Sequence, residues 1–570
     1  MASQATTSHG SGQPQPGREE LLLVAVCALA ASAGAVWWSW AHSAFLLYGD
    51  AEAHIHIARR LIDSHQPGLS QLGSVWLPLP HLLLVPFVAV DSWWRSGFAG
   101  VIPSAACYLL ACLGLYRLAR KWVSPMAAGF GTAFFALNPN LLYMQTTAMS
   151  EPLFLCLLIW SVLLAVEWHA GLDSEGEGNR LWVLIAVLVG AVFTRYDGWI
   201  LAFLIWVAMA VCLGRRKRLL QPRFVVASVV LLLAPLTWMG YNAAIFGDWL
   251  DFMRGPYSAA AIELRTSNGA IPPHPGWHDP WVSMLFFLKA ADMDSQFWNI
   301  FVVLGVLIGI SEVFMTQPGK RDRPVSRGKV GARRALWLLF LWLPLPFYAY
   351  SVSFGSVPIF LPVWWPHSYY NTRYGLELLP AFALALGLVA QGFWLEIRRL
   401  WAWSENPPGA RTVGSILALL IIWDVVAVLH RGPIVFIEAQ KNAESRGYYN
   451  RVIPETLGRL HAADPAAQVL MNTSSFPSIV PHAGLTYAQT INESDSKFIG
   501  PALAAPAEHA SIVLAFAGDE VDLAVKAHPA RLHAVQSFHS KDQPDATIYV
   551  VNGFPGTVSA PGDSTAPAAR

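Results

Sequence analysis

Long apolar stretches separated by short polar segments make up most of the first 431 residues of the chain. Most of these stretches hold about 20 residues, which is the length that a helix needs to cross a bilayer core of about 30 Å. The pattern therefore predicts about eleven membrane-spanning helices. Their predicted bounds are residues 21–42, 98–119, 125–145, 150–168, 181–194, 199–214, 224–246, 298–316, 335–352, 375–396 and 412–431.

One apolar stretch, from His81 to Val90, is too short to cross a bilayer. It is followed by Asp91, Trp93, Trp94 and Arg95, whose side chains suit the boundary between membrane and water. We therefore expect a helix that lies on the outer surface of the membrane. A twelfth span is the alternative.

After the last predicted span the pattern changes to short apolar runs between polar segments. Strands are expected at 468–472, 511–516, 534–538 and 546–551, and helices at 448–461 and 519–528. Their alternation predicts a small α/β domain over residues 432–552. Residues 1–20 and 553–570 are rich in Gly, Pro, Ser and Ala, and we expect them to be disordered. The fold class is thus an α-helical polytopic membrane protein, with a transmembrane domain over 21–431 and a small C-terminal soluble α/β domain.

The distribution of charge gives these spans an orientation. Charged residues make up 13% of the chain, about half of what a soluble domain carries. Basic residues cluster at 117–121, 215–218, 320–334 and 398–399, which predicts a cytoplasmic N-terminus. The loops 43–97 and 247–297 and the C-terminal domain then lie outside the cytoplasm. We expect an integral multi-pass protein of the plasma (inner) membrane.

Composition also excludes several classes of function. The formal net charge is +1 and no segment forms a basic domain, so nucleic acid is not an expected partner. All five cysteines fall in predicted spans, which gives no disulfide framework to a soluble part. The chain has no P-loop, no dinucleotide-binding glycine pattern, no HExxH helix and no GxSxG elbow.

Ionisable residues avoid the interiors of the predicted spans and gather at their outer ends, with Asp424 as the main exception. Charge at the centre of a span is costly, so its placement is informative. A transporter would place polar groups near the bilayer midplane. Several loops that bring polar groups to one water–lipid boundary predict an active site there.

The first outer loop is the richest of these polar segments. Asp50 stands at or just before the start of a predicted helix, where capping is its alternative role. Glu52 and Arg59 fall on one face of that helix and are candidates for substrate binding, as is His54. His54 and His56 diverge on a helix, so together they can bind a metal ion only from an irregular loop.

Two more candidate groups begin predicted spans. Glu151 opens the fourth span within Ser-Glu-Pro, and its alternative role is to favour the helix dipole. Arg195 and Asp197 precede the sixth span, and their alternative is to pair with each other at the membrane edge.

Aromatic residues and arginines occur together in two further segments. Arg254 and Tyr257 lie in the long outer loop, and Arg373 and Tyr374 lie just before the tenth span. Such residues suit a sugar and a phosphate, and they equally suit an interfacial belt. Arg373 is the better phosphate candidate, because a guanidinium group binds phosphate bidentately.

The chain resembles the GT-C superfamily of membrane glycosyltransferases over about residues 21–431. The similarity lies in an Asp-containing helix after the first span, the Pro-rich segment Trp76–His81, a basic turn after the second span and an acid at the start of the fourth. The most similar families are the protein O-mannosyltransferases and the aminoarabinose transferases of lipid A. The mannosyltransferases usually have Asp and Glu adjacent, whereas Ala51 separates Asp50 from Glu52 here. The loop between spans seven and eight is too short for the β-trefoil insertion of those enzymes.

The resemblance implies a polyprenyl-phosphate sugar donor, an inverting transfer and a catalytic carboxylate that maps onto Asp50. A carboxylate at the boundary suits the base that the acceptor hydroxyl needs, and Arg373, Arg195 or Arg59 suits the leaving phosphate. We expect Glu151 to orient the acceptor or to tune Asp50, with Asp197 as a supporting partner.

The function predicted from the sequence is therefore transfer of a sugar from such a donor to a hydroxyl of a glycan, lipid or protein acceptor, outside the cytoplasm. No specific cofactor is predicted, and a divalent metal ion is left open. The alternatives are a transporter or flippase for lipids or sugar-lipids, and a non-catalytic membrane assembly protein, which would not need Asp50 and Glu151.

Overall fold

The computed structural model describes residues 15–172, 177–267, 269–295, 299–314, 334–401, 409–541 and 543–555. The chain divides into two compact units. The first unit comprises Met1–Ala51, Ser74–Phe87 and Ser96–Lys441, and the second comprises Glu52–Gly73, Val88–Arg95 and Asn442–Arg570. The division falls within four helices, α2 (Gly49–Arg60), α3 (Pro78–Val88), α4 (Asp91–Ser96) and α20 (Ile434–Ala463).

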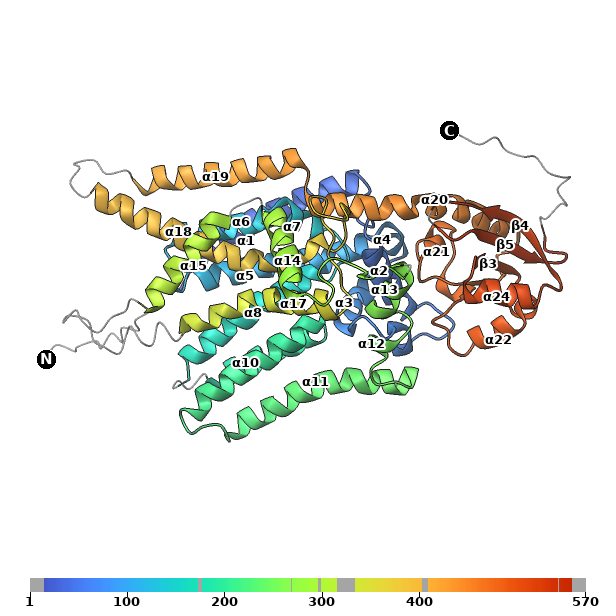
Figure 1. Cartoon of the computed structure of the whole chain (residues 1–570), viewed down its shortest axis with the longest axis horizontal. Helices are drawn as coiled ribbons and strands as arrows, with labels where there is room; N and C mark the ends of the chain where they lie inside the picture. The colour runs from blue at the N-terminus through green and yellow to red at the C-terminus, as the bar shows by residue number, and fades with distance from the viewer. Residues whose placement is uncertain are drawn as a thin grey trace. The chain divides into compact units, whose positions relative to one another are not determined.

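The regular elements in the described part of the first unit are helices (Figure 1). Its elements are α1 (Arg18–Ala41), α3 (Pro78–Val88), α5 (Phe98–Ala119), α6 (Pro125–Ala136), α7 (Pro139–Met144), α8 (Glu151–Ala170), α9 (Glu177–Val192), α10 (Tyr196–Gly214), α11 (Pro222–Phe246), α12 (Asp251–Arg254), α13 (Ala259–Thr266), α14 (Pro280–Ser295), α15 (Asn299–Phe314), the 3₁₀-helix η2 (Leu336–Trp342), α17 (Pro344–Phe354), the 3₁₀-helix η3 (Thr372–Leu378), α18 (Leu379–Leu400) and α19 (Ala410–Arg431).

Eight helical segments of the described residues are long and apolar enough to cross a membrane, or nine if the bent pair α14–α15 is one span. The chain is an integral membrane protein, as predicted, and eight of the predicted spans coincide with these segments. The other three predicted spans, 125–145, 181–194 and 298–316, correspond to the shorter helices α6 and α9 and to part of the bent pair. The count of eleven therefore stays a prediction.

The predicted span 125–145 is interrupted because a new helix begins inside it. Asn138 caps α7 with its side-chain oxygen, which accepts hydrogen bonds from the backbone N–H groups of Asn140 and Leu141. Pro139 has no N–H to continue the preceding helix. The apolar segment therefore forms two helices, α6 and α7.

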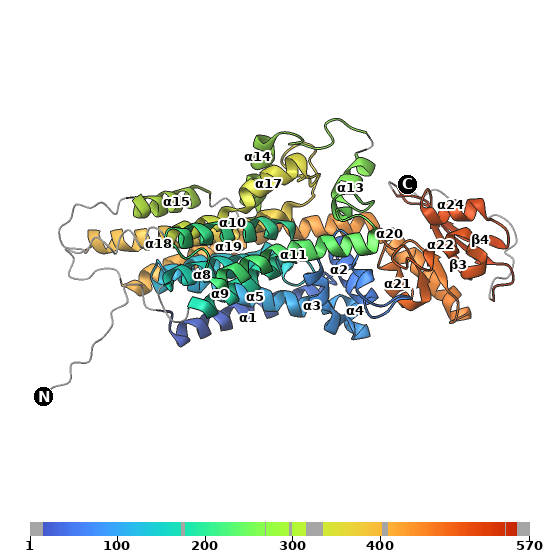
Figure 2. The same ribbon diagram turned by 90° about the horizontal axis from the view of Figure 1, so that it is seen from below.

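Small side chains allow the helices of the first unit to pack closely. A Cβ atom on Gly131 of α6 would lie 2.2 Å from the carbonyl oxygen of Ala383 on α18, and one on Gly305 of α15 would lie 2.2 Å from that of Ala385. Close backbone approach at small residues is typical of helix packing in membranes. Figure 2 shows α15 beside α18 in this unit.

The apolar stretch that was predicted to lie on the membrane surface forms α3. This helix has 11 residues, fewer than the eight segments above. It is joined to the rest of the first unit at its start, where the backbone N–H of Leu79 donates to the carbonyl oxygen of Phe193 at 2.9 Å. Its position at the membrane surface stays a prediction.

The second unit contains a five-stranded sheet with the strand order β2-β1-β3-β5-β4. Strand β1 pairs in parallel with β2 and β3, whereas β5 pairs antiparallel with β3 and β4. The elements are η1 (Leu69–Leu72), α4 (Asp91–Ser96), β1 (Val469–Met471), α21 (Ile479–His482), η4 (Tyr487–Gln489), β2 (Thr490–Ile491), α22 (Ile499–Ala504), α23 (Pro506–His509), β3 (Ile512–Phe516), α24 (Glu520–Ala527), β4 (Leu532–Phe538) and β5 (Ala546–Val551).

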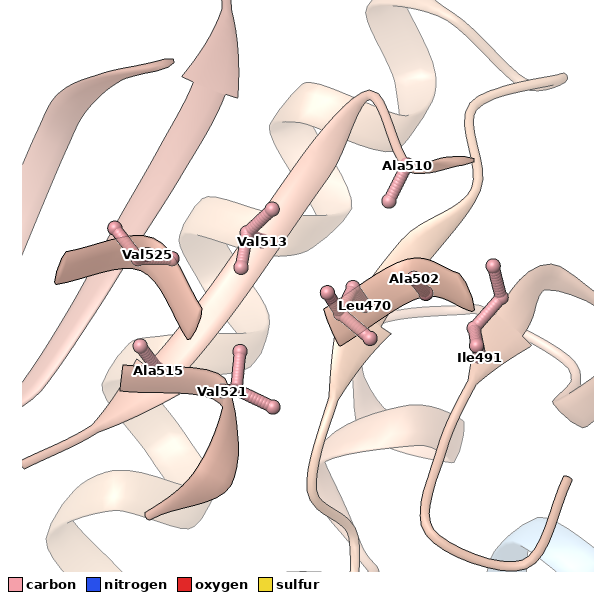
Figure 3. Close-up of a cluster of buried hydrophobic side chains, with 8 residues drawn as sticks. All are labelled: Leu470, Ile491, Ala502, Ala510, Val513, Ala515, Val521 and Val525. Carbon is pink, nitrogen blue, oxygen red and sulfur yellow. The ribbon is translucent and has the colours of Figure 1, made fainter. Parts of the chain in front are cut away.

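The predicted C-terminal α/β region is present, and its core lies between the sheet and two helices. Val513 and Ala515 point to the same face of β3, as residues two apart on a strand do. They pack with Val521 and Val525 of α24, and the cluster continues through Ala502 of α22 (Figure 3). The four predicted strands all form, while β2, with two residues, is too short for a sequence pattern to indicate.

The expected terminal tails are only partly described. Helix α1 begins at Arg18, so residues 18–20 are helical rather than disordered, with Glu19 and Glu20 in the first turn, where acids favour the helix dipole. Residues 1–14 and 556–570 lie outside the described part of the chain, as do residues 320–333 of the most basic predicted loop.

Candidate active site

The guanidinium group of Arg373 joins carboxylates from three different helices. Its Nη2 donates to Asp50 at 2.6 Å, its Nε to Glu151 at 3.1 Å and its Nη1 to Glu438 at 2.9 Å. Asp50 comes from α2, Glu151 begins α8 and Glu438 lies on α20. Segments that are far apart in the sequence therefore meet at one cation in the first unit.

Glu438 was not predicted as a site residue. Its carboxylate accepts hydrogen bonds from the backbone N–H groups of Asn371 and Thr372, at 2.9 and 2.7 Å, and from the Thr372 hydroxyl. Asn371 has a φ of +57°, a left-handed conformation that asparagine tolerates better than most residues. Glu438 thus fixes the turn that delivers Arg373.

A second guanidinium group lies beside the first. Arg195 donates through Nε to Asp197 at 3.2 Å, and its Nη1 is 3.4 Å from Glu151, which therefore bridges the two arginines. Its Nη2 donates to the Tyr348 hydroxyl at 2.6 Å and is 3.1 Å from Glu377.

Aromatic rings complete this group of side chains. The Tyr374 ring is close to both arginines, with the Cζ of Arg373 at 5.0 Å and that of Arg195 at 5.3 Å from its centroid. Tyr374 also stacks on Tyr348 at 4.8 Å. The Tyr48 ring lies 5.1 Å from the Cζ of Arg373. Such cation–π contacts keep the guanidinium planes in place.

Tyr48 also ties the start of the first outer loop to α20. Its hydroxyl donates to the carbonyl oxygen of Val435 at 2.8 Å. Burial raises the pKa of Tyr48 well above its usual value, so the phenol stays neutral and acts as a donor. The contact holds the chain two residues before Asp50.

The group contains more acidic than basic side chains. Five carboxylates, those of Asp50, Glu151, Asp197, Glu377 and Glu438, pair with two guanidinium groups. Four of these carboxylates are at most 4% exposed, whereas the Asp50 side chain is 43% exposed. Asp50 is therefore the carboxylate that a substrate can reach.

The local sequence explains how each group is delivered. Glu151 is the first residue of α8, after Ser150 and before Pro152, a proline position that suits the first turn of a helix. Its Oε1 meets both arginines, while its Oε2 has no hydrogen-bond partner within the described part of the chain. Arg195 has an extended backbone just before α10, and Asp197 lies in the first turn of that helix.

Six of the predicted residues are thus brought together: Asp50, Glu151, Arg195, Asp197, Arg373 and Tyr374. Glu377, Glu438 and Tyr348 join them without having been predicted. Glu377 and Tyr348 fall inside predicted spans, and Glu438 falls in the segment after the last span. The sequence contains no pattern that relates these three residues to the outer loops.

Three predicted residues belong to the second unit. Glu52 is buried and forms an ion pair with Arg446, and burial raises the pKa of Glu52 although Arg446 opposes this. Arg59 donates to Asp63 at 2.9 Å and lies 4.4 Å from the centroid of the Trp94 ring. His54 is buried in the same helix. Substrate binding by Glu52, His54 and Arg59 stays a prediction.

The two residues predicted from the long outer loop are not among the six that meet. Arg254 is exposed and pairs with Asp248 of the same loop at 2.8 Å. Tyr257 is 39% exposed. A role of Arg254 and Tyr257 in substrate binding stays a prediction as well.

A metal site is not formed by side chains in the described residues. No group of three or more His, Cys, Asp or Glu side chains in that part of the chain is arranged to hold a metal ion. The carboxylates around Arg373 and Arg195 face guanidinium groups instead.

Comparison with known proteins identifies a related family over part of the chain. Residues 90–241 match the family model described as dolichyl-phosphate-mannose-protein mannosyltransferase. This segment contains Glu151, Arg195 and Asp197, while Asp50, Arg373 and Glu438 lie outside it. No curated protein matches the chain.

Solved structures resemble nearly the whole chain, among them the following two. The oligosaccharyltransferase of Archaeoglobus fulgidus, in complex with Zn and sulfate, has 12% identity and a TM-score of 0.50, with 93% of this chain and 72% of that chain covered. ArnT from Cupriavidus metallidurans, bound to undecaprenyl phosphate, has 13% identity and a TM-score of 0.49, with 95% and 100% covered. The predicted resemblance to GT-C membrane glycosyltransferases is confirmed by the family model and by the fold of the first of these structures.

Proposed function

We propose that the protein is an inverting glycosyltransferase that takes a sugar from a polyprenyl-phosphate donor. The observation that carries this proposal is the pair formed by Asp50 and Arg373. The exposed Asp50 carboxylate contacts a guanidinium group that also pairs with two buried acids, Glu151 and Glu438. A base and a fixed positive charge side by side suit attack by a hydroxyl together with departure of a phosphate.

The donor class is supported by the family match. The matched model is named for mannosyl transfer from dolichyl phosphate, which is a polyprenyl-type carrier. A lipid phosphate leaves without strong acid catalysis, so the site needs a base and charge stabilisation rather than a strong general acid. The Asp50, Arg373 and Arg195 side chains provide both.

In the proposed reaction, an acceptor hydroxyl attacks the anomeric carbon of the sugar. The new oxygen–carbon bond forms as the bond from that carbon to the phosphate oxygen breaks. The hydroxyl proton passes to Asp50, and the polyprenyl phosphate leaves with the bonding electron pair. Arg373, with Arg195 beside it, stabilises the charge that develops on the phosphate.

The buried acids have a supporting role in this proposal. Glu151 contacts both arginines, so it fixes their spacing and, through Arg373, influences Asp50. Asp197 and Glu377 hold Arg195 in the same way. Held guanidinium groups need little reorganisation when charge develops, which is the basis of electrostatic catalysis.

We place the reaction on the extracytoplasmic face of the plasma membrane, with a hydroxyl of a glycan, lipid or protein as acceptor. The positions of the basic loops support this orientation.

The proposal is tested by transfer assays with purified protein in lipid nanodiscs. A panel of radiolabelled polyprenyl-phosphate sugars serves as donors and a membrane extract as the source of acceptors. We expect label to move from one donor and the Asp50→Asn variant to lose at least about 100-fold in rate, as expected when a general base is removed.

The Glu396→Gln variant is the control, because it removes a carboxylate that is 62% exposed near the end of α18. It should transfer like the wild type. Full activity in Asp50→Asn would exclude Asp50 as the base. Movement of intact sugar-lipid across the bilayer without transfer would favour a transporter instead.

A further inference from the structure

The geometry of the Arg373 guanidinium group restricts how it can bind a phosphate. A guanidinium group offers two forked edges for bidentate binding, one formed by Nε and Nη2 and the other by Nη1 and Nη2. Both edges include Nη2. In this structure Nη2 donates to Asp50 at 2.6 Å, Nε to Glu151 at 3.1 Å and Nη1 to Glu438 at 2.9 Å, so each edge is already in use.

The three carboxylates around Arg373 are not equally replaceable. Glu151 and Glu438 are 1% and 4% exposed, and Glu438 is further held by the backbone of Asn371 and Thr372. The Asp50 side chain is 43% exposed. A phosphate that reaches Arg373 from solvent or from the membrane surface therefore meets Asp50 first.

We propose that the donor phosphate and the Asp50 carboxylate compete for Nη2 of Arg373, so that donor binding itself releases the catalytic base. The proposal rests on the function proposed above and adds an order of events to it. Before the donor binds, the Asp50 carboxylate is held by the Arg373 guanidinium group. After the phosphate takes its place, the freed carboxylate accepts the proton of the acceptor hydroxyl.

The excess of acids in the group supports an exchange rather than an addition. Two guanidinium groups already face five carboxylates, and a phosphate brings more negative charge. Its binding is favoured if one carboxylate moves away, because like charges in a site of low dielectric repel strongly. Asp50 lies at the second residue of α2 and is the most exposed of the five.

This exchange predicts that removal of the Asp50 charge strengthens donor binding while it abolishes transfer. The experiment measures the binding of undecaprenyl phosphate and of dolichyl phosphate, both without sugar, to the full-length protein in nanodiscs. We expect Asp50→Asn to bind one of these lipids about tenfold more tightly than the wild type, since a competing charge-assisted hydrogen bond is lost.

Matched variants separate competition from other effects. Asp50→Glu keeps a carboxylate near Arg373 and should not tighten binding. Glu396→Gln removes an exposed carboxylate elsewhere in the chain and should leave the affinity unchanged. When Arg373→Gln is also present, Asp50→Asn should no longer change the affinity, because the shared partner is gone. The thermal unfolding midpoint of each variant checks that it is folded.

The outcomes are distinct. Equal or weaker binding by Asp50→Asn would overturn the exchange while leaving the glycosyltransferase proposal in place. The same tightening in Glu396→Gln would also overturn it, because the effect would then be one of general charge. If neither lipid binds to any variant, both this inference and the proposed function are wrong.

Discussion

A single residue, Arg373, organises most of the chemistry in the first unit. The sequence indicated it as a phosphate ligand because of its place before a span, and the structure surrounds it with acids from α2, α8 and α20. A buried ion pair loses favourable solvation, so it persists only where additional hydrogen bonds satisfy its members. The hydrogen bonds from Asn371 and Thr372 to Glu438 are of this kind.

Another residue, His56, makes the stability of the second unit depend on pH. Burial lowers the pKa of His56 well below its usual value, and the nearby Arg60 and His482 lower it further. Its Nδ1 accepts a hydrogen bond from the Trp94 indole at 3.1 Å. The folded state therefore keeps His56 neutral, whereas the unfolded chain binds a proton near pH 6.5.

Proton linkage determines whether stability rises or falls with pH. Below about pH 6.5 the unfolded chain takes up a proton at His56 and the folded chain does not, so stability falls as the pH falls. We expect the wild type to lose up to about 1.4 kcal/mol more than His56→Asn between pH 6.5 and 5.5, because one proton per pH unit corresponds to that free energy. Asn retains an acceptor for Trp94.

The measurement is the thermal or denaturant unfolding of the full-length protein at the two pH values. His509→Asn, at an exposed histidine, is the control and should behave like the wild type. An equal loss of stability in the wild type and His56→Asn would show that this imidazole is not held neutral.

At the scale of elements, helix packing in the first unit depends on where small residues occur. Gly129 and Gly131 both lie on α6, but only Gly131 faces α18 closely. A Cβ on Gly131 would be 2.2 Å from a backbone carbonyl oxygen, and one on Gly129 would meet nothing within 4 Å. Because a backbone atom cannot rotate away, α6 and α18 would have to separate.

We therefore expect Gly131→Ala to destabilise the protein by about 1–3 kcal/mol, the usual cost of overpacking. Gly129→Ala should be neutral or stabilise it by up to about 1 kcal/mol, because alanine favours the helix over glycine. The unfolding midpoints of the two variants in the same detergent give the comparison. A similar midpoint for both would mean that the α6–α18 contact is loose.

At the scale of the whole molecule, the ion pairs constrain how the chain crosses the membrane. Glu151 begins α8 and Arg195 follows α9, yet their side chains are 3.4 Å apart. Helix α8 therefore runs away from this group of side chains and α9 runs back to it, which supports α9 as a membrane crossing despite its 16 residues. Likewise Arg373 and Glu438 flank α18 and α19 and meet at 2.9 Å.

The orientation of the chain can be tested with topology reporters. We expect alkaline phosphatase to be active when it is fused after residue 555, and inactive when it is inserted in the basic turn 215–218. The enzyme matures only outside the cytoplasm, and Lys and Arg favour the cytoplasmic side. A green fluorescent protein reporter at the same positions should give the opposite pattern. Active alkaline phosphatase in the turn 215–218, together with fluorescence after residue 555, would show that the orientation is the opposite of the proposed one.

Structural features that depend on local patterns could be predicted from the sequence alone. The length of an apolar segment determines whether a helix can cross a bilayer. Backbone groups without hydrogen bonds are excluded from lipid. Short apolar runs between polar segments indicated four of the five strands. Polar residues at span ends also indicated Asp50, Glu151, Arg195, Asp197, Arg373 and Tyr374, since charge is excluded from the span interiors.

Only the tertiary structure decided which of these residues meet. Glu438, Glu377 and Tyr348 join Arg373 and Arg195 through contacts between helices that are far apart in the sequence. Glu52, by contrast, lies two residues from Asp50 but pairs with Arg446 in the second unit. A helix sends residues two apart in different directions, and what each one meets depends on elements that the local sequence does not contain.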